Sequence, residues 1–542
     1  MVAKHEKEPG ASSTAPDAEP PAEKVVPVEN DAASSDVPYS IYTTNQKRLM
    51  VLAGSLAAFF SPLSANIYMP ALNTLAKDLH VSNTLIGFTV TSYLIFQGLA
   101  PTFVGAFADA QGRRPAYIGC IIIYLCANIG LALQRNYAAL LILRCLQSSG
   151  SSGTVALSNA VTADLVTSAE RGAYIGYASV AAILAPSLAP VLGGLLAQYA
   201  GWPWIFWFLV IFAVAFFVPF FVWFPETCRR IVGNGSIPPP RLNHSLPTWL
   251  AERRLKAAGQ HEAFAERDAL AAKRRLQFPS PVDTLKIICT RLAGTVLVTN
   301  GLLFSCYYAV NASLPSQFEA AYGLNDVQIS LIYLPLGVGS LLSAFTIGKL
   351  IDWNYRRHAA RLGFPVQRNR QADLSGFPIE RARLEIALPL LAFGAASIVV
   401  YGWLLEARVS IAGPCVMLFG LGYAVVAGFN TMAVLMIDVY PGAPATATAA
   451  NNLVRCWMGA GATAFVIPLT EKIGVGWTCT LFSGVWVVFS FPMLIMLMRR
   501  GPRWREETRD REERRRKAKE GVGSGEKEAG AREEVVGKEM KV

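Results

Sequence analysis

Long apolar stretches recur along the chain, separated by short polar connections. There are twelve of them, each about 20 residues or longer, which is enough for a helix to cross the roughly 30 Å hydrocarbon core of a bilayer. A water-soluble core would alternate buried and exposed positions instead. The pattern therefore predicts an all-α integral membrane protein with twelve transmembrane helices, at residues 48–70, 85–107, 115–134, 138–163, 172–198, 202–224, 292–315, 327–350, 385–405, 410–437, 445–468 and 477–498.

The polar segments between these stretches divide the chain into two halves of six spans. The halves cover residues 48–224 and 292–498, and a central loop at 225–291 joins them. The N-terminal tail, 1–47, is rich in Pro, Ala, Ser and Glu and lacks the apolar core of a signal peptide, so we expect it to be disordered. The C-terminal tail, 499–542, is a run of mixed charges.

The placement of charge predicts the topology. The chain is 53% hydrophobic and only 16% charged, with a net charge of +11. Lys and Arg concentrate in the central loop and in a second loop at 351–384, so by the positive-inside rule the long loops and both termini are cytosolic. The rule explains the basic residues better than binding to nucleic acid does, so we expect no nucleic-acid partner. Helical spacing also predicts a helix from Pro247 to Gln277, either on the membrane surface or in solvent.

The sequence lacks the residue patterns that several kinds of function require. The nine cysteines contain no CxxC pair and most lie in or beside apolar runs, so we expect no disulfide, no metal site and no cofactor. There is no Walker-type phosphate loop, which argues against ATP as the power source. No histidine lies in a span, and no catalytic constellation occurs in the membrane. These features indicate a secondary transporter rather than an enzyme.

The two halves repeat a short motif after their second span. It consists of a glycine, an aspartate and two arginines: Gly105, Asp109, Arg113 and Arg114 in the first half, and Gly348, Asp352, Arg356 and Arg357 in the second, 243 positions further on. Aspartate and arginine four residues apart are close enough to pair. Duplicated halves are a transporter architecture in which the site lies between the halves, near the membrane midplane.

The loop from Gly105 to Arg114 resembles the signature of the major facilitator superfamily between its second and third spans. The resemblance implies a major-facilitator-type fold of two six-helix halves. It also implies a conformational latch that holds the halves together at the cytosolic face. The residues that correspond to the latch are Gly105, Asp109, Arg113, Arg114, Asp352 and Arg356.

The fifth span resembles the motif that marks the antiporter branch of this superfamily. It contains Pro186, Pro190, Gly193 and Gly194. Prolines bend a helix, and small residues let it pack closely against the facing half. A proline-kinked packing helix with no bearing on transport direction is the alternative.

Three further segments resemble the fungal twelve-span drug:proton antiporters, especially the quinidine-resistance-like branch and related organic-acid exporters. They are Ser61 to Leu72, Pro225-Glu226-Thr227 with Val232 to Ser236, and Ala450 to Cys456. The resemblance implies export of small organic molecules across the plasma membrane, driven by inward proton flow.

Two arginines inside spans suggest the kind of substrate. Arg455 lies about ten residues from the cytosolic end of its span, roughly halfway across the bilayer at ~1.5 Å per residue, and Arg144 lies nearer the outer end of span 4. A charge at such depth is costly unless it faces a cavity or a partner, and no acidic residue in the spans lies at matching depth. Because arginine binds carboxylates in bidentate fashion, we favour organic anions such as di- or tricarboxylates or acidic metabolites. The predicted site comprises Arg455, Arg144, Asn451, Asn452, Asn66, Tyr68 and Gln97.

Other interpretations stay open. Arg455 alternatively binds backbone carbonyls at a broken helix while neutral drugs pass beside it, and Arg144 alternatively snorkels to the surface. The chain would then be a multidrug, xenobiotic or secondary-metabolite efflux pump. An uptake symporter and a transporter-like sensor of the same fold are further alternatives. Under the favoured interpretation we expect a monomer in the lipid bilayer, with a small-molecule substrate and protons as the coupling ion.

Overall fold

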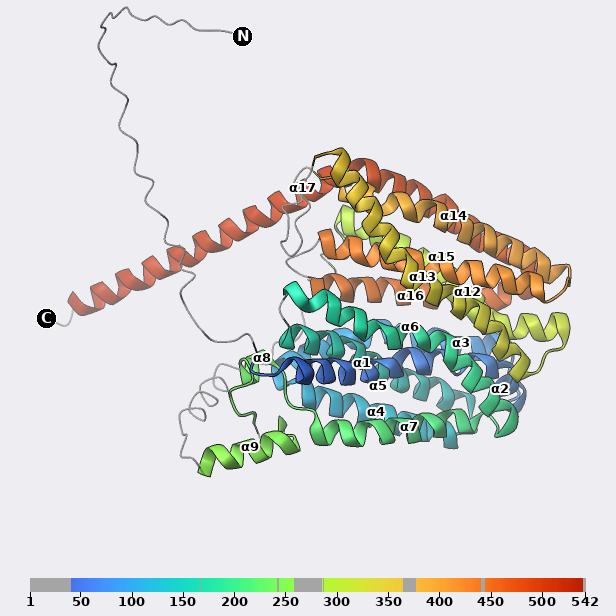
Figure 1. The fold of residues 1–542 in the computed structure, drawn as a ribbon, viewed down its shortest axis with the longest axis horizontal. Coiled ribbons are helices and arrows are strands. Elements are labelled where there is room, and N and C mark those ends of the chain that lie inside the picture. The colour runs from blue at the N-terminus through green and yellow to red at the C-terminus, as the bar shows by residue number, and fades with distance from the viewer. Residues whose placement is uncertain are drawn as a thin grey trace, which may run out of the picture. The chain divides into compact units, whose positions relative to one another are not determined.

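Helices make up the protein (Figure 1), which we describe from a computed structural model covering residues 40–166, 168–240, 243–257, 285, 287–363, 377–439 and 444–539. The described part contains no strand. The first half and the central loop hold α1 (Thr44–Asn66), the 3-10 helix η1 (Met69–Ala71), α2 (Leu72–Asp78), α3 (Asn83–Gln111), α4 (Arg113–Leu133), α5 (Tyr137–Leu165), α6 (Ser168–Tyr199), α7 (Pro203–Trp223), α8 (Arg229–Val232) and α9 (Leu246–Ala257). The second half holds α12 (Arg291–Tyr322), α13 (Asp326–Arg361), α14 (Ile379–Glu406), α15 (Ala412–Val439), α16 (Pro444–Ile473) and α17 (Val475–Glu539).

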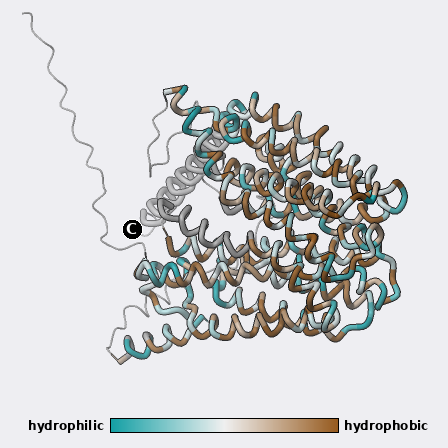
Figure 2. The backbone as a smooth tube through the Cα atoms, turned by 45° about the vertical axis from the view of Figure 1, so that its right-hand side comes forward, coloured by the Kyte–Doolittle hydropathy of each residue, from teal (hydrophilic) through white to brown (hydrophobic). Residues whose placement is uncertain are grey.

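Long helices occupy the places of the twelve expected spans. Among the described residues, ten helices are long and apolar enough to cross a membrane, and α5 and α6 are two further long helices. Large hydrophobic side chains such as Phe345 and Phe465 are 62% and 70% exposed, as expected for surfaces that face lipid. Figure 2 shows hydrophobic residues along the helices and hydrophilic residues toward their ends and connections. The predicted all-α membrane fold is confirmed.

Local signals in the sequence set the helix ends. The backbone N–H of Gln46 donates to Thr43 Oγ1, and the N–H of Thr43 donates to Gln46 Oε1, which forms a capping box at the start of α1. Asn325 and Gln328 form the same arrangement before α13. Because of its cap, α1 begins at Thr44, whereas the N-terminal tail was expected to extend to residue 47.

Two other expected segments are partly described. The first part of the helix expected from Pro247 to Gln277 is present as α9, and residues 258–284 lie outside the described range. The C-terminal tail was expected to begin at Arg499, but α17 continues as one helix to Glu539. That segment is rich in Glu, Lys and Arg, which have high helix propensity.

The helices form two halves that meet along two helix pairs. Within the first half α5 packs against α1, α3 and α4, and within the second half α15 packs against α13 and α14. Between the halves, α6 packs against α13 and α3 packs against α16. Figure 1 shows the first half in blue to green and the second half in yellow to red.

The two ends of the helix bundle are named here by their charge. The basic end is the end at which α1, α4 and α12 begin, and it carries Arg48, Arg113, Arg291 and Arg361. The far end is the opposite one, at which α3, α5 and α13 begin.

Candidate transport site

The arginine of the first half is sealed inside the protein. Arg144, on α5, has no exposed surface, and its guanidinium carbon lies 4.2 Å from the ring centroid of Tyr68 and 4.3 Å from that of Tyr93. Its Nη1 donates to Gln147 Oε1 at 2.5 Å and to the carbonyl of Ser64 at 3.4 Å. Among the described residues no carboxylate pairs with it. Its charge is therefore stabilised by aromatic faces and neutral acceptors.

A network of neutral hydrogen bonds holds this arginine in place. Gln147 Nε2 donates to Asn128 Oδ1 at 2.7 Å, and Asn128 Nδ2 donates to the carbonyl of Tyr124. The hydroxyls of Tyr124 and Ser64 are 2.7 Å apart, and that of Tyr93 lies 3.1 Å from Ser151 Oγ. The network joins α1, α3, α4 and α5. Arg144 is consequently part of the packed interior of the first half and does not snorkel.

The arginine of the second half is only half-buried. Arg455, on α16, places its guanidinium carbon 4.7 Å from the ring centroid of Phe304 on α12 and 5.9 Å from that of Phe429 on α15. Its Nη2 donates to Asn452 Oδ1 at 3.0 Å, and its Nε has no hydrogen-bond partner. As with Arg144, the described residues include no carboxylate at ion-pair distance.

The predicted neutral residues divide into two groups. Asn452 Nδ2 donates across the line between the halves to the carbonyl of Gln97, at 3.0 Å, and Asn451 Oδ1 accepts from Asn300 Nδ2 at 2.7 Å. Both asparagines lie on α16 with Arg455. Asn66, by contrast, donates to the carbonyl of Pro62 on its own helix. The structure thus gathers Asn451, Asn452 and the Gln97 backbone near Arg455, whereas Asn66 bonds within α1.

Tyr68 was placed in the same predicted site as Arg144, but the other aromatic partners of the two arginines were not identified from the sequence. Tyr93, Phe304 and Phe429 come from spans 2, 7 and 10. A tyrosine within an apolar span can be recognised in the sequence as a candidate polar contact. Its partner cannot, because tertiary packing decides which spans face one another.

At the basic end of the first half, a buried arginine pairs with two carboxylates. Arg113 Nη1 lies 2.5 Å from Asp109 Oδ1, and its Nε donates to Asp164 Oδ2 at 2.8 Å. Arg114 donates to the carbonyl of Phe224. A Cβ added at Gly105 would meet no atom within 4 Å, so this glycine is not required for packing here. All these contacts lie within the first half.

The carboxylate of Glu226 caps the start of α4. It is 1% exposed and accepts hydrogen bonds from five groups: the backbone N–H of Arg113, Arg114, Thr227 and Cys228, and Asn243 Nδ2. Anions are stabilised at helix N-termini, where backbone N–H groups are otherwise unpaired. The Pro225-Glu226-Thr227 segment stood out in the sequence as a resemblance only, and its capping role follows from the structure.

The second half uses its copy of the motif differently. Asp352 was expected to pair with Arg356, but its Oδ1 lies 3.5 Å from Arg383 Nη1, and Arg356 is exposed. Further contacts between α13 and α14 come from Asn354, which donates to the carbonyl of Ala382 at 2.7 Å, and from His358, which lies 2.6 Å from Glu385 Oε2. The equal spacing in the two halves therefore does not produce equal contacts.

The glycines of α6 lie at close approaches. A Cβ added at Gly193 would collide with the carbonyl of Ile67, and one at Gly194 would collide with Ser330 and with the carbonyl of Asp326 on α13. Pro186 and Pro190 lie within the same helix. The first glycine thus packs against the first half and the second against the other half. Whether this packing sets the direction of transport stays a prediction.

Among the described residues, the hydrogen bonds that join the two halves are found between the middle of the helix bundle and its far end. The deepest is the bond from Asn452 to Gln97, and Thr91 and Thr463 follow with their hydroxyls 2.9 Å apart. At the far end Thr74 Oγ1 donates to Asp326 Oδ2 at 2.6 Å. Lys77 Nζ lies 2.5 Å from Glu319 Oε1.

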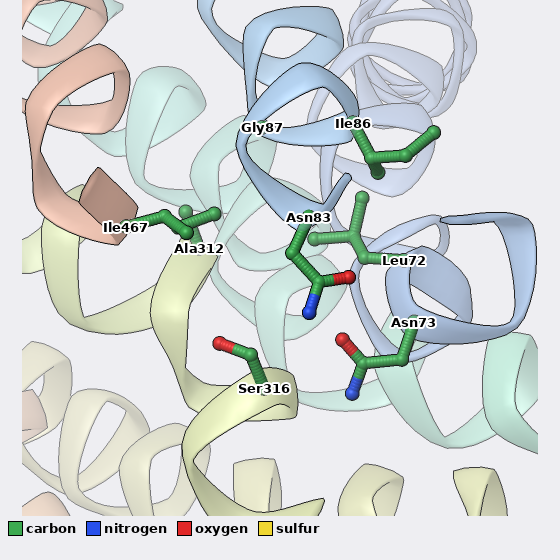
Figure 3. Close-up of a pocket in the computed structure, with 8 residues that line it drawn as sticks. All are labelled: Leu72, Asn73, Asn83, Ile86, Gly87, Ala312, Ser316 and Ile467. Carbon is green, nitrogen blue, oxygen red and sulfur yellow. The ribbon is translucent and has the colours of Figure 1, made fainter. Parts of the chain in front are cut away.

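A small pocket lies beside this line of contact. Its lining comes from both halves, and Figure 3 shows polar groups of Asn73, Asn83 and Ser316 around it. The full lining is Leu72, Asn73, Asn83, Ile86, Gly87, Ala312, Ser316 and Ile467. The far end is thus the better-joined end of the described interface.

Two halves of membrane-spanning helices around buried polar residues define a class, the polytopic helical transporters. The family model "Major Facilitator Superfamily" matches residues 54–463. Among similar proteins, the MFS-type transporter phiD of a fungal species is 48% identical over 486 residues, which are 90% of this chain and 73% of phiD. Citrate exporter 1 of Aspergillus niger is 35% identical over 492 residues, 90% of this chain and 91% of the exporter.

A solved structure shows the same fold at low sequence identity. The human organic anion transporter MFSD10 (TETRAN) superposes with a TM-score of 0.53 at 18% identity, covering 84% of this chain and 100% of that one. The chain belongs to the Major Facilitator Superfamily. It is a multi-pass membrane transporter and not an enzyme, as the sequence predicted.

Proposed function

We propose that this transporter exports small organic anions from the cytosol across the plasma membrane in exchange for protons, and that Arg455 binds the anionic group. The observation that carries the proposal is the surroundings of Arg455, a half-buried arginine with no carboxylate beside it among the described residues. Arg144 also has nitrogens without a partner, but it is fully buried. A charge inside the membrane is retained where it meets a cavity or a partner. A substrate carboxylate would provide that partner.

Two observations support the direction. The concentration of Lys and Arg at the basic end favours a cytosolic position for that end. Among the described residues, the hydrogen bonds between the halves lie from the middle of the bundle to its far end, which suits a state that loads substrate from the cytosol. The similarity to citrate exporter 1 of Aspergillus niger supports an organic acid as cargo.

Export by cells that carry Arg455 variants tests the proposal. Loaded cells would be assayed for release of organic acids that range from compact polyacids to acids with alkyl or aromatic bodies, with the cationic dye rhodamine 6G as counter-probe. Arg455→Gln removes the charge and should reduce acid export at least about tenfold, whereas Arg455→Lys keeps a charge without the bidentate fork and should retain some export. Arg408→Gln, at an exposed position between α14 and α15, is the control and should export normally.

Two results would contradict the proposal. One is normal acid export by Arg455→Gln with normal amounts of protein in the membrane. The other is a wild type that moves only the cationic dye. Proton coupling is tested separately, by the dependence of acid export on an imposed pH gradient in vesicles.

A further inference from the structure

Arg455 borders a continuous group of aromatic rings from α12 and α15. Phe304 lies 4.3 Å from Tyr308 and 5.8 Å from Phe429, measured between ring centroids. Tyr307 lies 5.6 Å from Tyr308 and 6.4 Å from Phe429. Each ring therefore lies close to the next. In this conformation Phe304, Tyr307 and Tyr308 are buried and Phe429 is half-buried. We call Phe304, Tyr307, Tyr308 and Phe429 the aromatic wall.

Of the two arginines inside the spans, only Arg455 keeps exposed surface. Arg144 has no exposed surface and is enclosed between Tyr68 and Tyr93, whereas Arg455 is half-buried. The other polar groups near Arg455 are the neutral amides of Asn300, Asn451 and Asn452. One guanidinium compensates one negative charge, so a further charge gains no partner here, and acids of equal charge are distinguished by their apolar parts.

The other neighbours of the Arg455 guanidinium are aromatic rings, which would suit an apolar part of a substrate. Phe304 lies 4.7 Å and Phe429 5.9 Å from the Arg455 guanidinium carbon, so a carboxylate bound to the guanidinium lies next to their rings. Aromatic rings provide large apolar contact areas. A compact, fully hydrophilic acid would gain nothing from these apolar neighbours.

Building on the proposed function, we propose that the preferred substrates are amphipathic acids, with an acidic head at Arg455 and an apolar or aromatic body against the aromatic wall. Compact acids such as citrate and succinate are poor substrates. This inference narrows the di- and tricarboxylates expected from the sequence. Burial of one methylene group changes affinity by about fourfold, so an alkyl chain that is partly buried separates the two kinds of acid clearly.

The test compares acids that share a head group. The full-length protein is purified and reconstituted into phosphatidylcholine vesicles, and initial counterflow rates are measured for octylsuccinate, succinate and citrate, with protein-free vesicles subtracted. Octyltrimethylammonium carries the same alkyl chain on a cationic head. We expect octylsuccinate to be transported at least about tenfold faster than succinate or citrate at equal low concentration, and octyltrimethylammonium not to be transported.

Variants locate the preference on the wall. Phe304→Leu and Phe429→Leu should reduce the ratio of octylsuccinate to succinate transport to below about threefold, because a flat ring surface is lost next to Arg455. Phe465→Leu, on α16 and 70% exposed, is the matched control and should keep the wild-type ratio. If a wall variant does not fold, competition between the acids on the wild type still decides the substrate preference.

The outcomes separate this inference from the proposed function. Citrate or succinate transport equal to that of octylsuccinate, and lost in Arg455→Gln, overturns the amphipathic preference but leaves anion export intact. Transport of octyltrimethylammonium without transport of any acid overturns both. An unchanged ratio in folded Phe304→Leu and Phe429→Leu overturns the role of the wall.

Discussion

The basic ends of the two halves carry the same motif and use it in opposite ways. In the first half Arg113 is buried between Asp109 and Asp164. In the second half Arg356 is exposed, and Asp352, which is itself 69% exposed, lies 3.5 Å from Arg383. A repeat in sequence has become a buried cluster on one side and a surface ion pair on the other.

One residue accounts for much of this difference. Gly112 has a φ of +112°, which ends α3 and lets Arg113 begin α4. A Cβ at this position would also collide with Glu226 and Asn243. The corresponding position in the second half holds Tyr355, and there α13 continues without a break to Arg361. Without a glycine the helix does not turn, and Arg356 stays on its surface.

The comparison shows that the motif itself is buried only in the first half, and that other residues fix the basic end of the second half. The cluster of the first half is buried and includes the carboxylate cap of Glu226. The second half combines the exposed Asp352–Arg383 pair and the bond from Asn354 to Ala382 with two further pairs, His358–Glu385 at 2.6 Å and the buried Glu380 with Arg505 at 3.5 Å. Buried charges are costly to leave without partners, and exposed pairs contribute little. Mutations can test this asymmetry, beginning where the two halves meet.

The largest effect is expected from Gly194→Leu. The added side chain would enter the space of Ser330 and the Asp326 carbonyl, so α6 and α13 could not approach as they do, at a cost of about 3 kcal/mol or more. We expect loss of folded protein or of export, measured by size-exclusion profile in detergent and by acid release from cells. Gly461→Leu is the control, because a Cβ there would meet no atom within 4 Å. Full activity of Gly194→Leu would disprove the close contact.

The second-largest effect, on stability, is expected at the buried carboxylate of Glu226 that caps α4. Glu226→Gln removes the charge and turns one acceptor oxygen into a donor that faces backbone N–H groups, so we expect the folded state to lose about 2–3 kcal/mol. Thermal unfolding in detergent would register it as a lower midpoint. Glu406→Gln is a matched control, since Glu406 accepts from the N–H groups of Val475 and Gly476 at an exposed helix start. An equal loss in both variants would show that burial of Glu226 does not matter.

The contrast between local and distant contacts also explains what the sequence could predict. The twelve helices were predictable because the bilayer requires length and apolarity of each span separately. The pair Asp109–Arg113 was predictable because its members lie four residues apart. Asp164 and Glu226 lie 51 and 113 positions from Arg113, and only tertiary packing brings them there.

The two arginines inside the spans also show that distant contacts cannot be predicted from the sequence. Their depth and the absence of a matching acid were visible in the sequence, and both were assigned to a substrate site. Their exposure was not visible, because Tyr93 and Phe304, which pack against Arg144 and Arg455, come from other spans. The structure therefore separates a sealed arginine from an accessible one, and only the accessible one enters the proposed function.

A smaller effect separates the two carboxylates that flank Arg113. The side chain of Asp164 is 11% exposed and that of Asp109 is 48% exposed. Asp164→Asn should therefore cost about 2 kcal/mol or more in stability, and Asp109→Asn below about 1 kcal/mol. Both should reduce export if the cluster acts as a latch. Unfolding midpoints and export rates, normalised to protein in the membrane, check the two statements, and normal export by Asp109→Asn would remove that residue from the latch.

The smallest effect is expected at the copy of the motif in the second half. Asp352→Asn removes an exposed carboxylate whose only ion-pair partner among the described residues is Arg383, at 3.5 Å, so stability should change by less than about 0.5 kcal/mol. Arg356→Gln should be equally mild, because its side chain is exposed. Export by both variants should stay within about twofold of wild type, since no buried group loses a partner. A strong loss of export by Asp352→Asn with an unchanged unfolding midpoint would contradict this expectation. It would mean that Asp352 forms an ion pair in another conformation of the transport cycle, as Asp109 does here.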